Sequence, residues 1–235
     1  MGRCANSAIG NAIVIGLLGG TFDPIHYGHL RVALEIREAL GLDEVRFLPC
    51  GIPPHRGVPG ASAESRAALV ALALADVPEF VLDRRELMRS GPSYTYDTLC
   101  SLREDFGAER PFCLILGADA FGGLPGWHRA GELLDLAHII VARRPGEVPK
   151  MAPPLMALLG ERITDCPADL RSSAGGRVMW IDVTQLDISA TAIREQLRCD
   201  GNPRFLIPDA VLEAIRTQGL YGREQTHTLT DSGVT

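Results

Sequence analysis

Two histidines three residues apart are the side chains of this chain that point most directly to chemistry. His26 and His29 end the segment Gly19-Gly20-Thr21-Phe22-Asp23-Pro24-Ile25-His26-Tyr27-Gly28-His29. At that spacing on the first turn of a helix, the two side chains share one face. The leading glycines let a ligand approach the backbone closely. Imidazole, hydroxyl and backbone N–H groups in one place suit phosphate binding and the stabilisation of charge that develops on phosphate.

The flanking residues predict the elements that position this segment. The apolar run from Ala12 to Leu18 is typical of a buried parallel strand. Leu30 to Leu40 has apolar residues three and four apart, as in a helix with one buried face. The segment is therefore a strand-to-helix turn, the place where α/β proteins bind phosphate with free N–H groups and the positive end of a helix.

The rest of the chain alternates between apolar runs and helical patterns. Further strands are predicted at 44–49, 80–82, 112–116, 138–142 and 178–183. Further helices are predicted at 63–75, 95–106, 129–136, 189–197 and 208–218, with a loop over 50–62 and a loop or broken helix over 117–127. This alternation predicts an α/β, Rossmann-like fold, a doubly wound and mostly parallel sheet with helices on both faces. Residues that follow the strands would then meet at one rim of the sheet.

Length and composition favour one globular domain. The chain has 235 residues, of which 46% are hydrophobic and 22% charged, and its net charge is −6. We expect a flexible leader over 1–11, one domain over 12–221 and a disordered tail over 222–235. The acidic balance argues against a nucleic-acid partner. No apolar run is long enough to cross a membrane and no signal peptide is evident, so we expect a cytoplasmic protein.

The cysteines and the lysine restrict the chemistry further. Six cysteines occur without a C-x-x-C pair, which argues against a disulfide framework or a zinc site, and we expect no metal-binding side chains. Cys113 lies within an apolar run and is expected to be a small buried residue. Lys150 is the only lysine and stands in a proline-rich stretch, so neither a P-loop nor a lysine Schiff base is expected.

Two segments resemble the signatures of one enzyme family. His26-Tyr27-Gly28-His29 fits the H-x-G-H motif of the nucleotidyltransferase superfamily, and its longer context resembles the nicotinate-nucleotide adenylyltransferases. Asp187 to Arg194 resembles the I-S-S/A-T-x-I-R signature of the same family. The resemblance extends over about residues 13 to 221 and includes shorter segments at 53–56, 93–95, 117–119 and 142–145.

This resemblance implies a single nucleotidyltransferase domain over 12–221. The implied reaction transfers the adenylyl group of ATP to nicotinate mononucleotide, and it yields nicotinate adenine dinucleotide and pyrophosphate for NAD biosynthesis. Mg²⁺ is expected to accompany ATP. Because the attacking phosphate is already an anion, the protein mainly has to align two polyanions and stabilise developing charge.

The resemblance also implies three groups of site residues. Those expected to be catalytic are His26, His29 and Arg194. Those expected to bind the ATP phosphates are Gly19, Gly20, Thr21, Phe22, Ser189 and Thr191. Those expected to bind nicotinate mononucleotide are His55, Arg56, Thr95, Asp119, Trp127, His128 and Arg144. Asp119 would accept hydrogen bonds from the ribose, and Trp127 would stack on the pyridine ring.

Two departures from the family pattern fall on the mononucleotide side. Cys50-Gly51 stands where many relatives carry an asparagine-containing turn, and His128 stands where tyrosine is common. Nicotinamide mononucleotide or dual specificity therefore stays open, as does a non-catalytic nucleotide-binding regulator. Related transferases that use lysines around the phosphates are disfavoured, and the G-x-G-x-x-G fingerprint of a Rossmann oxidoreductase is absent from the turn. A homo-oligomer is left open.

Overall fold

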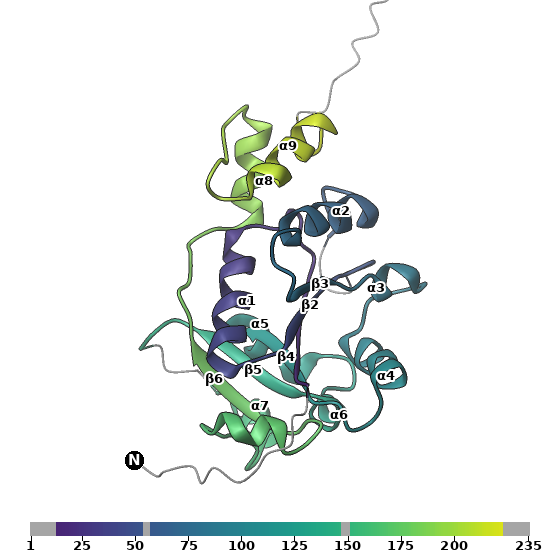
Figure 1. The fold of residues 1–235 in the computed structure, drawn as a ribbon, viewed down its shortest axis with the longest axis vertical. Helices are drawn as coiled ribbons and strands as arrows, with labels where there is room; N and C mark the ends of the chain where they lie inside the picture. Colours follow the sequence, from purple (N-terminus) through teal and green to yellow (C-terminus); the bar gives the residue numbers. More distant parts are fainter. Residues whose placement is uncertain (1–12, 54–56, 147–150, 223–235) are drawn as a thin grey trace, which may run out of the picture.

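A parallel sheet forms the centre of the protein (Figure 1). The computed structural model describes residues 13–53, 57–146 and 151–222. Within these residues the strands are β1 (Ile15–Gly20), β2 (Glu44–Pro49), β3 (Phe80–Leu82), β4 (Phe112–Gly117), β5 (His138–Arg143) and β6 (Val178–Asp182). Their order is β3-β2-β1-β4-β5-β6, and every neighbouring pair is parallel. The chain changes winding direction between β1 and β4, where sheets of this kind open a crevice for ligands.

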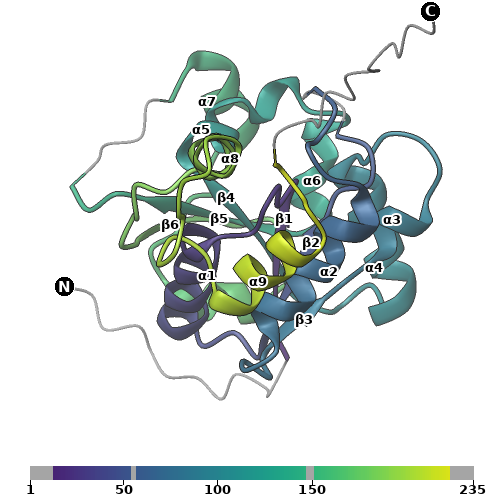
Figure 2. The same cartoon turned by 90° about the horizontal axis from the view of Figure 1, so that it is seen from above.

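Helices cover both faces of this sheet (Figures 1 and 2). They are α1 (Tyr27–Leu40), α2 (Ala63–Leu74), α3 (Arg85–Met88), α4 (Thr95–Phe106), α5 (Ala118–Gly122), α6 (Ala130–Leu136), α7 (Pro153–Leu159), α8 (Ala190–Arg198) and α9 (Asp209–Thr217), with 3₁₀ turns η1 (Leu124–Gly126) and η2 (Pro167–Arg171). None of these helices is long and apolar enough to span a membrane. The doubly wound α/β fold expected from the sequence is confirmed, with all named strands parallel.

The strand β4 shows how the two layers of the core are divided. Its residues Cys113 and Ile115 pack into the apolar cluster that includes α1, α2, α8 and α9. Phe112 and Leu114 pack into the other cluster, with α4, α6 and α7. This alternation follows from the two-residue period of a strand that is buried on both faces. Cys113 is buried as expected, and that burial raises the pKa of its thiol to about 12.

The largest boundary differences from the sequence expectation lie on either side of the β1–α1 turn. β1 starts at Ile15 and extends to Gly20, and α1 starts at Tyr27, three residues before the apolar pattern begins. Two helices were not expected: α3, which has only four residues, and α7, whose first residues are Pro153 and Pro154. Proline is tolerated in the first turn of a helix, so a proline-rich stretch can lead into one. The leader and Lys150 lie outside the described residues, as does the tail beyond Gly222.

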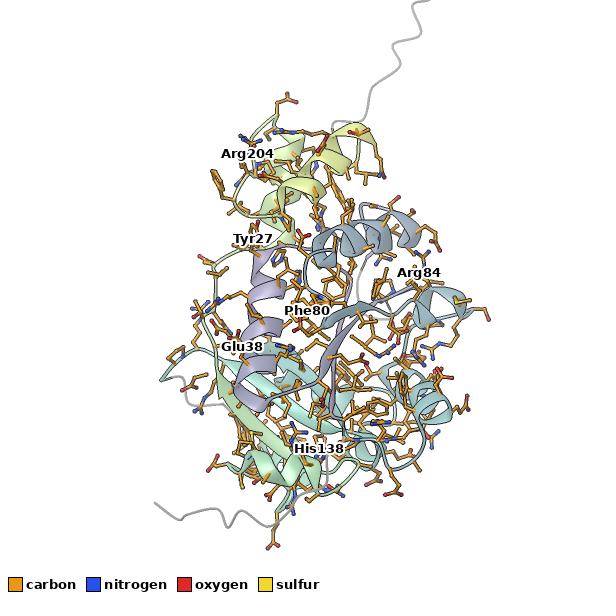
Figure 3. The ribbon with its side chains drawn as sticks, in the orientation of Figure 1. Tyr27, Glu38, Phe80, Arg84, His138 and Arg204 are labelled. Atoms are coloured by element: carbon orange, nitrogen blue, oxygen red, sulfur yellow. The ribbon has the colours of Figure 1, made fainter. Side chains whose placement is uncertain are left out.

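The buried histidine at the start of β5 is structural. His138 lies at the opposite end of the sheet from Tyr27, which begins α1 (Figure 3). Its Nε2 atom donates to the carbonyl of Ser173 at 3.0 Å, and its Nδ1 atom accepts from the N–H of Arg177 at 3.1 Å. Burial lowers the pKa of His138. Both nitrogens of this neutral ring are therefore used to fix the segment that precedes β6.

Candidate active site

The turn between β1 and α1 stacks the two motif histidines on each other. His26 is the extended N-cap residue of α1 and His29 is the third residue of the helix. The backbone N–H of His26 donates to Nδ1 of His29 at 3.3 Å, and the ring centroids lie 3.7 Å apart. The expected shared face is therefore present, although His26 precedes the helix instead of lying on its first turn.

Gly28 makes this stacking possible. A Cβ atom at position 28 would lie 2.9 Å from Nδ1 and 3.0 Å from Cε1 of His26. Real Cβ atoms essentially never come so close to another heavy atom. The glycine of the H-x-G-H motif is thus needed because the His26 ring occupies the space over it.

Phe22 supports the histidines from the core side. Its backbone has a left-handed φ of 48°, and its side chain is 2% exposed. The ring contacts His29 edge to face at 5.1 Å and packs on Phe47. Phe22 also borders the cavity that both sequence motifs line, but because its side chain lies in the core, a ligand there would reach only its backbone.

Burial sets the protonation state of His26. Its side chain is almost fully enclosed, and this burial lowers its pKa to about 4. Among the described residues, its Nδ1 atom has no hydrogen-bond partner. The ring is consequently neutral near pH 7, and a neutral imidazole can donate one hydrogen bond without bringing a full charge.

The two sequence motifs meet at one cavity of about 860 Å³. This phosphate-side cavity is bordered by the β1–α1 turn, the loop 57–59, the start of α5 and the start of α8. Ser189 caps α8, since its Oγ accepts from the N–H of Ala192 at 3.2 Å. The predicted residues that the cavity brings together are Gly19, Gly20, Thr21, Phe22, His26, His29, Asp119, Ser189, Thr191 and Arg194. A helix start and a glycine turn that face the same space are suited to polyphosphate.

Asp23 connects this cavity to distant parts of the chain, and the sequence analysis did not single it out. Its carboxylate accepts hydrogen bonds from the N–H groups of Gly60 and Ala61 and from the hydroxyl of Tyr221. Its backbone carbonyl accepts from Nη1 of Arg194 at 2.6 Å. One buried aspartate thus holds the loop 57–61, the segment after α9 and the arginine of the second motif.

Arg66 is a second residue that the sequence analysis missed. Its side chain is 1% exposed, and no carboxylate in the described residues lies within ion-pair distance of it. Instead the guanidinium donates to the carbonyls of Thr21 at 2.6 Å, Cys50 at 2.8 Å and Gly51 at 3.2 Å. A buried charge without such partners would be very costly. Arg66 therefore ties the β1–α1 turn to the loop after β2, and it places a positive charge next to Thr21, which borders the phosphate-side cavity.

A second cavity, of about 410 Å³, adjoins the first along β1 and β4. Both cavities are bordered by Gly19, His26, His29 and Gly117, so a ligand in one would lie beside a ligand in the other. Trp127 borders the second cavity together with Leu186 and Ile188, and its side chain is half-buried. A partly apolar space with an indole at its edge suits an aromatic ring.

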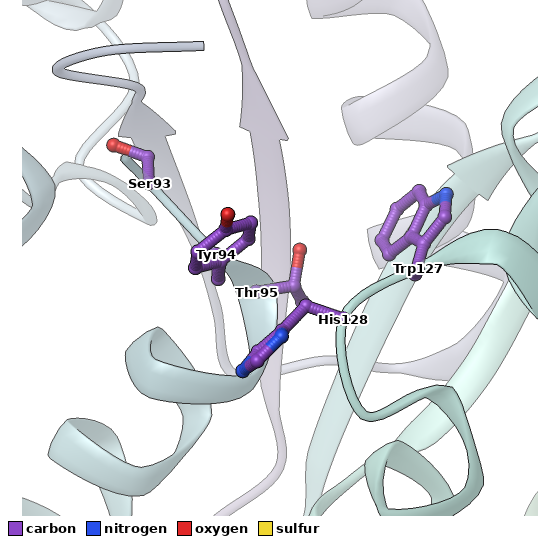
Figure 4. A pocket seen from close by; sticks show the side chains of 5 residues that line it. All are labelled: Ser93, Tyr94, Thr95, Trp127 and His128. Carbon is purple, nitrogen blue, oxygen red and sulfur yellow. The ribbon is translucent and has the colours of Figure 1, made fainter. Parts of the chain in front are cut away.

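Trp127 also borders a small pocket of about 100 Å³, shown in Figure 4. The rings of Tyr94 and His128 stack there with centroids 4.5 Å apart, and Trp127 lies on the other side of the pocket (Figure 4). Thr95 is the first residue of α4, so the pocket adjoins the N–H groups that begin a helix. The predicted residues Thr95, Trp127 and His128 are thus brought together at this pocket.

The other predicted mononucleotide residues lie further out. Asp119 is an exposed residue on the first turn of α5, whose N-cap is Gly117, and it borders the phosphate-side cavity. Arg144 is exposed beyond β5 and its Nε donates to Oε1 of Gln185 at 2.8 Å, at the edge of the second cavity. His55 and Arg56 lie outside the described residues.

A parallel sheet with an H-x-G-H turn at its switch point defines a nucleotidyltransferase of the cytidylyltransferase-like class, and the model of that family matches residues 17–196. Within this class the chain belongs to the nicotinate-nucleotide adenylyltransferase family. A relative from Aeromonas hydrophila named "Probable nicotinate-nucleotide adenylyltransferase" is 50% identical over 207 residues, which cover 88% of this chain and 96% of the relative. A relative of the same name from Methylococcus capsulatus is 49% identical over 211 residues, or 89% of this chain and 100% of that protein.

Solved structures agree on the fold. The nicotinic acid mononucleotide adenylyltransferase of Plasmodium falciparum in complex with NaAD has a TM-score of 0.66 at 18% identity, with 88% of this chain and 97% of that chain covered. The same Plasmodium enzyme in complex with APC has a TM-score of 0.65. At this identity the likeness concerns the arrangement of strands and helices.

Proposed function

We propose that this protein transfers the adenylyl group of ATP to nicotinate mononucleotide and so forms nicotinate adenine dinucleotide and pyrophosphate in NAD biosynthesis. The proposal is carried by one observation, the meeting of both sequence motifs at a single cavity that adjoins a second one beside Trp127. Family membership at about half sequence identity supports the same reaction.

The phosphate-side cavity would hold the triphosphate of ATP. An oxygen of the mononucleotide phosphate attacks the α-phosphorus, a new P–O bond forms, and the bond to pyrophosphate breaks. The neutral His26, its stacked neighbour His29 and the start of α8 would donate hydrogen bonds to the phosphate oxygens. Such pre-placed donors stabilise charge in the transition state without reorganising during the reaction.

ATP would enter as its magnesium complex. Magnesium that accompanies nucleotides is held mostly by phosphate oxygens and water and needs few protein carboxylates. Asp23 at the cavity is engaged with Gly60, Ala61 and Tyr221. The described residues include no group of three or more side chains suited to hold a metal ion. We therefore propose that the triphosphate brings the metal, and that the exposed Asp119 is the other carboxylate at the wall of the cavity.

The pocket at Trp127 would select the acid over the amide. A nicotinate carboxylate can accept hydrogen bonds from the N–H groups at the start of α4. In nicotinamide, the NH₂ group of the amide is a donor and would face these N–H donors. Mispairing buried polar groups costs about 1–3 kcal/mol. We expect kcat/KM for nicotinate mononucleotide to exceed that for nicotinamide mononucleotide by about one to two decades.

One assay tests both parts of this proposal. Purified protein is incubated with ATP, Mg²⁺ and either mononucleotide, and both dinucleotide and pyrophosphate are quantified. Equal kcat/KM values would make the enzyme dual-specific, and a preference for the amide would overturn the acid assignment while leaving adenylyl transfer standing. Binding of ATP without either product would instead favour a regulator. Cytoplasmic localisation and homo-oligomer formation stay expectations outside this assay.

A further inference from the structure

The carboxylate of Asp23 is almost saturated with hydrogen bonds. It is 5% exposed, and its Oδ2 accepts from the N–H of Gly60 at 2.7 Å. Its Oδ1 accepts from the N–H of Ala61 at 3.2 Å and from the hydroxyl of Tyr221 at 2.8 Å. A carboxylate offers about four acceptor positions, so these three donors leave little capacity for another partner.

Arg194 lies beside this carboxylate but is held chiefly by other groups. Its Nη1 donates to the backbone carbonyl of Asp23 at 2.6 Å, whereas the nearest carboxylate oxygen is 3.5 Å away. Its Nη2 approaches Oγ1 of Thr191 at 3.5 Å, and both side chains border the phosphate-side cavity. An arginine beside a free carboxylate would normally form a shorter, bidentate pair.

Tyr221 and Arg194 both pack closely against Gly60. A Cβ atom at position 60 would lie 3.1 Å from the Tyr221 ring and 3.2 Å from Cδ of Arg194. The ring and the arginine stem therefore pack against the same glycine. Burial also raises the pKa of Tyr221, so its hydroxyl stays protonated and can only donate to Asp23.

We propose that Tyr221 is a positioning residue that keeps Arg194 available for the triphosphate by occupying Oδ1 of Asp23. Without the hydroxyl, the buried Oδ1 atom of Asp23 keeps only the longer hydrogen bond from the N–H of Ala61, at 3.2 Å. Among the described residues, Arg194 is the cation that forms an ion pair with the Asp23 carboxylate, with its Nη1 atom 3.5 Å from Oδ2, and it would turn from the cavity toward the under-bonded carboxylate. The inference rests on the proposed function in one respect, that the phosphate-side cavity binds ATP.

The variant Tyr221→Phe tests this inference, because it removes the hydroxyl and keeps the ring against Gly60. We expect the Kd of Mg²⁺·ATP, measured by calorimetry without the second substrate, to rise about five- to tenfold. KM for ATP should rise by the same factor, and KM for the mononucleotide should stay within about twofold. Tyr27→Phe, on the exposed side of α1, is the matched control and should leave both KM values unchanged.

A double-variant comparison separates positioning from mere anchoring of the chain. In an Arg194→Ala background, Tyr221→Phe should have no further effect on the Kd of ATP, because the group that it positions is gone. An equal effect in both backgrounds, a parallel rise of both KM values, or no effect at all would overturn the inference. A variant too unstable to assay would also overturn it, since the hydroxyl would then serve folding. Wild-type protein that binds ATP but forms no dinucleotide would contradict the proposed function, while the Kd comparison would still decide the role of Tyr221.

Discussion

The phosphate-side cavity and the pocket at Trp127 are built in different ways. Around the first, the buried ring of His26 stacks on His29, and the buried side chains of Asp23 and Arg66 are hydrogen-bonded to backbone groups from several segments. Around the second, His128 is exposed, Trp127 is half-buried, and the main contacts are between rings. The region proposed for phosphate chemistry is thus held in place by several hydrogen bonds at once. The region proposed for the pyridine ring depends on contacts between partly exposed rings, so we expect substitutions there to disturb the fold less. One departure from the family pattern, His128, lies in this pocket, whereas the carbonyls of Cys50 and Gly51 accept hydrogen bonds from Arg66.

The largest effect should come from removing His29. We expect His29→Ala to lower kcat by about 10²–10³ while the protein stays folded, because a pre-placed donor to transition-state charge is lost. Steady-state kinetics and circular dichroism measure the two parts of this statement. Arg31→Ala on the same helix, whose side chain pairs with Glu35 at the surface, is the control. A folded His29→Ala enzyme with near wild-type kcat would remove His29 from the mechanism.

Burial of His26 should appear in the dependence of stability on pH. Its pKa of about 4 in the folded protein lies below the ordinary value, so the unfolded chain takes up the proton first. The stabilising contribution of neutral His26 should therefore be fully present above about pH 6.5. The free energy of unfolding should fall by about 3 kcal/mol as the pH drops toward 4. Urea unfolding at several pH values measures this change in the free energy of unfolding. His26→Asn, which retains a residue suited to cap α1, should show a shallower slope. Identical slopes would mean that His26 is not buried in its neutral form.

Gly28→Ala should separate activity from stability. The added Cβ displaces the His26 ring, and misplacement of about one ångström at a catalytic group can lower a rate by roughly ten- to a hundredfold. Alanine favours a helix over glycine by up to about 1 kcal/mol, so the melting temperature should hold or rise. Kinetics and thermal unfolding of one protein sample measure both. Loss of activity together with loss of stability would show that the whole turn is disturbed, and the special role of the ring contact would then be wrong.

The smallest effect is expected on the pyridine side. Trp127→Ala should raise KM for the mononucleotide by about two- to twelvefold, the equivalent of one aromatic stacking contact, and leave KM for ATP nearly unchanged. Trp180→Phe, on β6, is the control. If both KM values rise together and the melting temperature falls, Trp127 is a core residue. The proposed difference in construction between the two regions would then be wrong.

Sequence reasoning found the fold and both motifs, and it missed contacts between single residues that are far apart in the chain. The β1–α1 turn and the Ser189 cap lie within a few residues of one another, so spacing alone indicates them. Tyr221 reaches Asp23 across 198 positions, and no periodic pattern connects two such residues. One feature of the sequence does indicate that Arg66 is buried. It lies three and four residues before Leu69 and Val70, and all three are buried on α2, so it occupies the apolar face of that helix. An arginine there must find acceptors inside the protein.

The position of Trp127 between two cavities also gives the molecule an optical reporter of its own. The chain contains two tryptophans, and the other, Trp180, packs edge to face on Phe121 with ring centroids 5.9 Å apart. Trp127 borders both the second cavity and the small pocket with His128. A change in tryptophan fluorescence when a ligand is added would therefore report chiefly on binding at the pyridine side. A ligand that fills only the phosphate-side cavity would leave the fluorescence nearly unchanged.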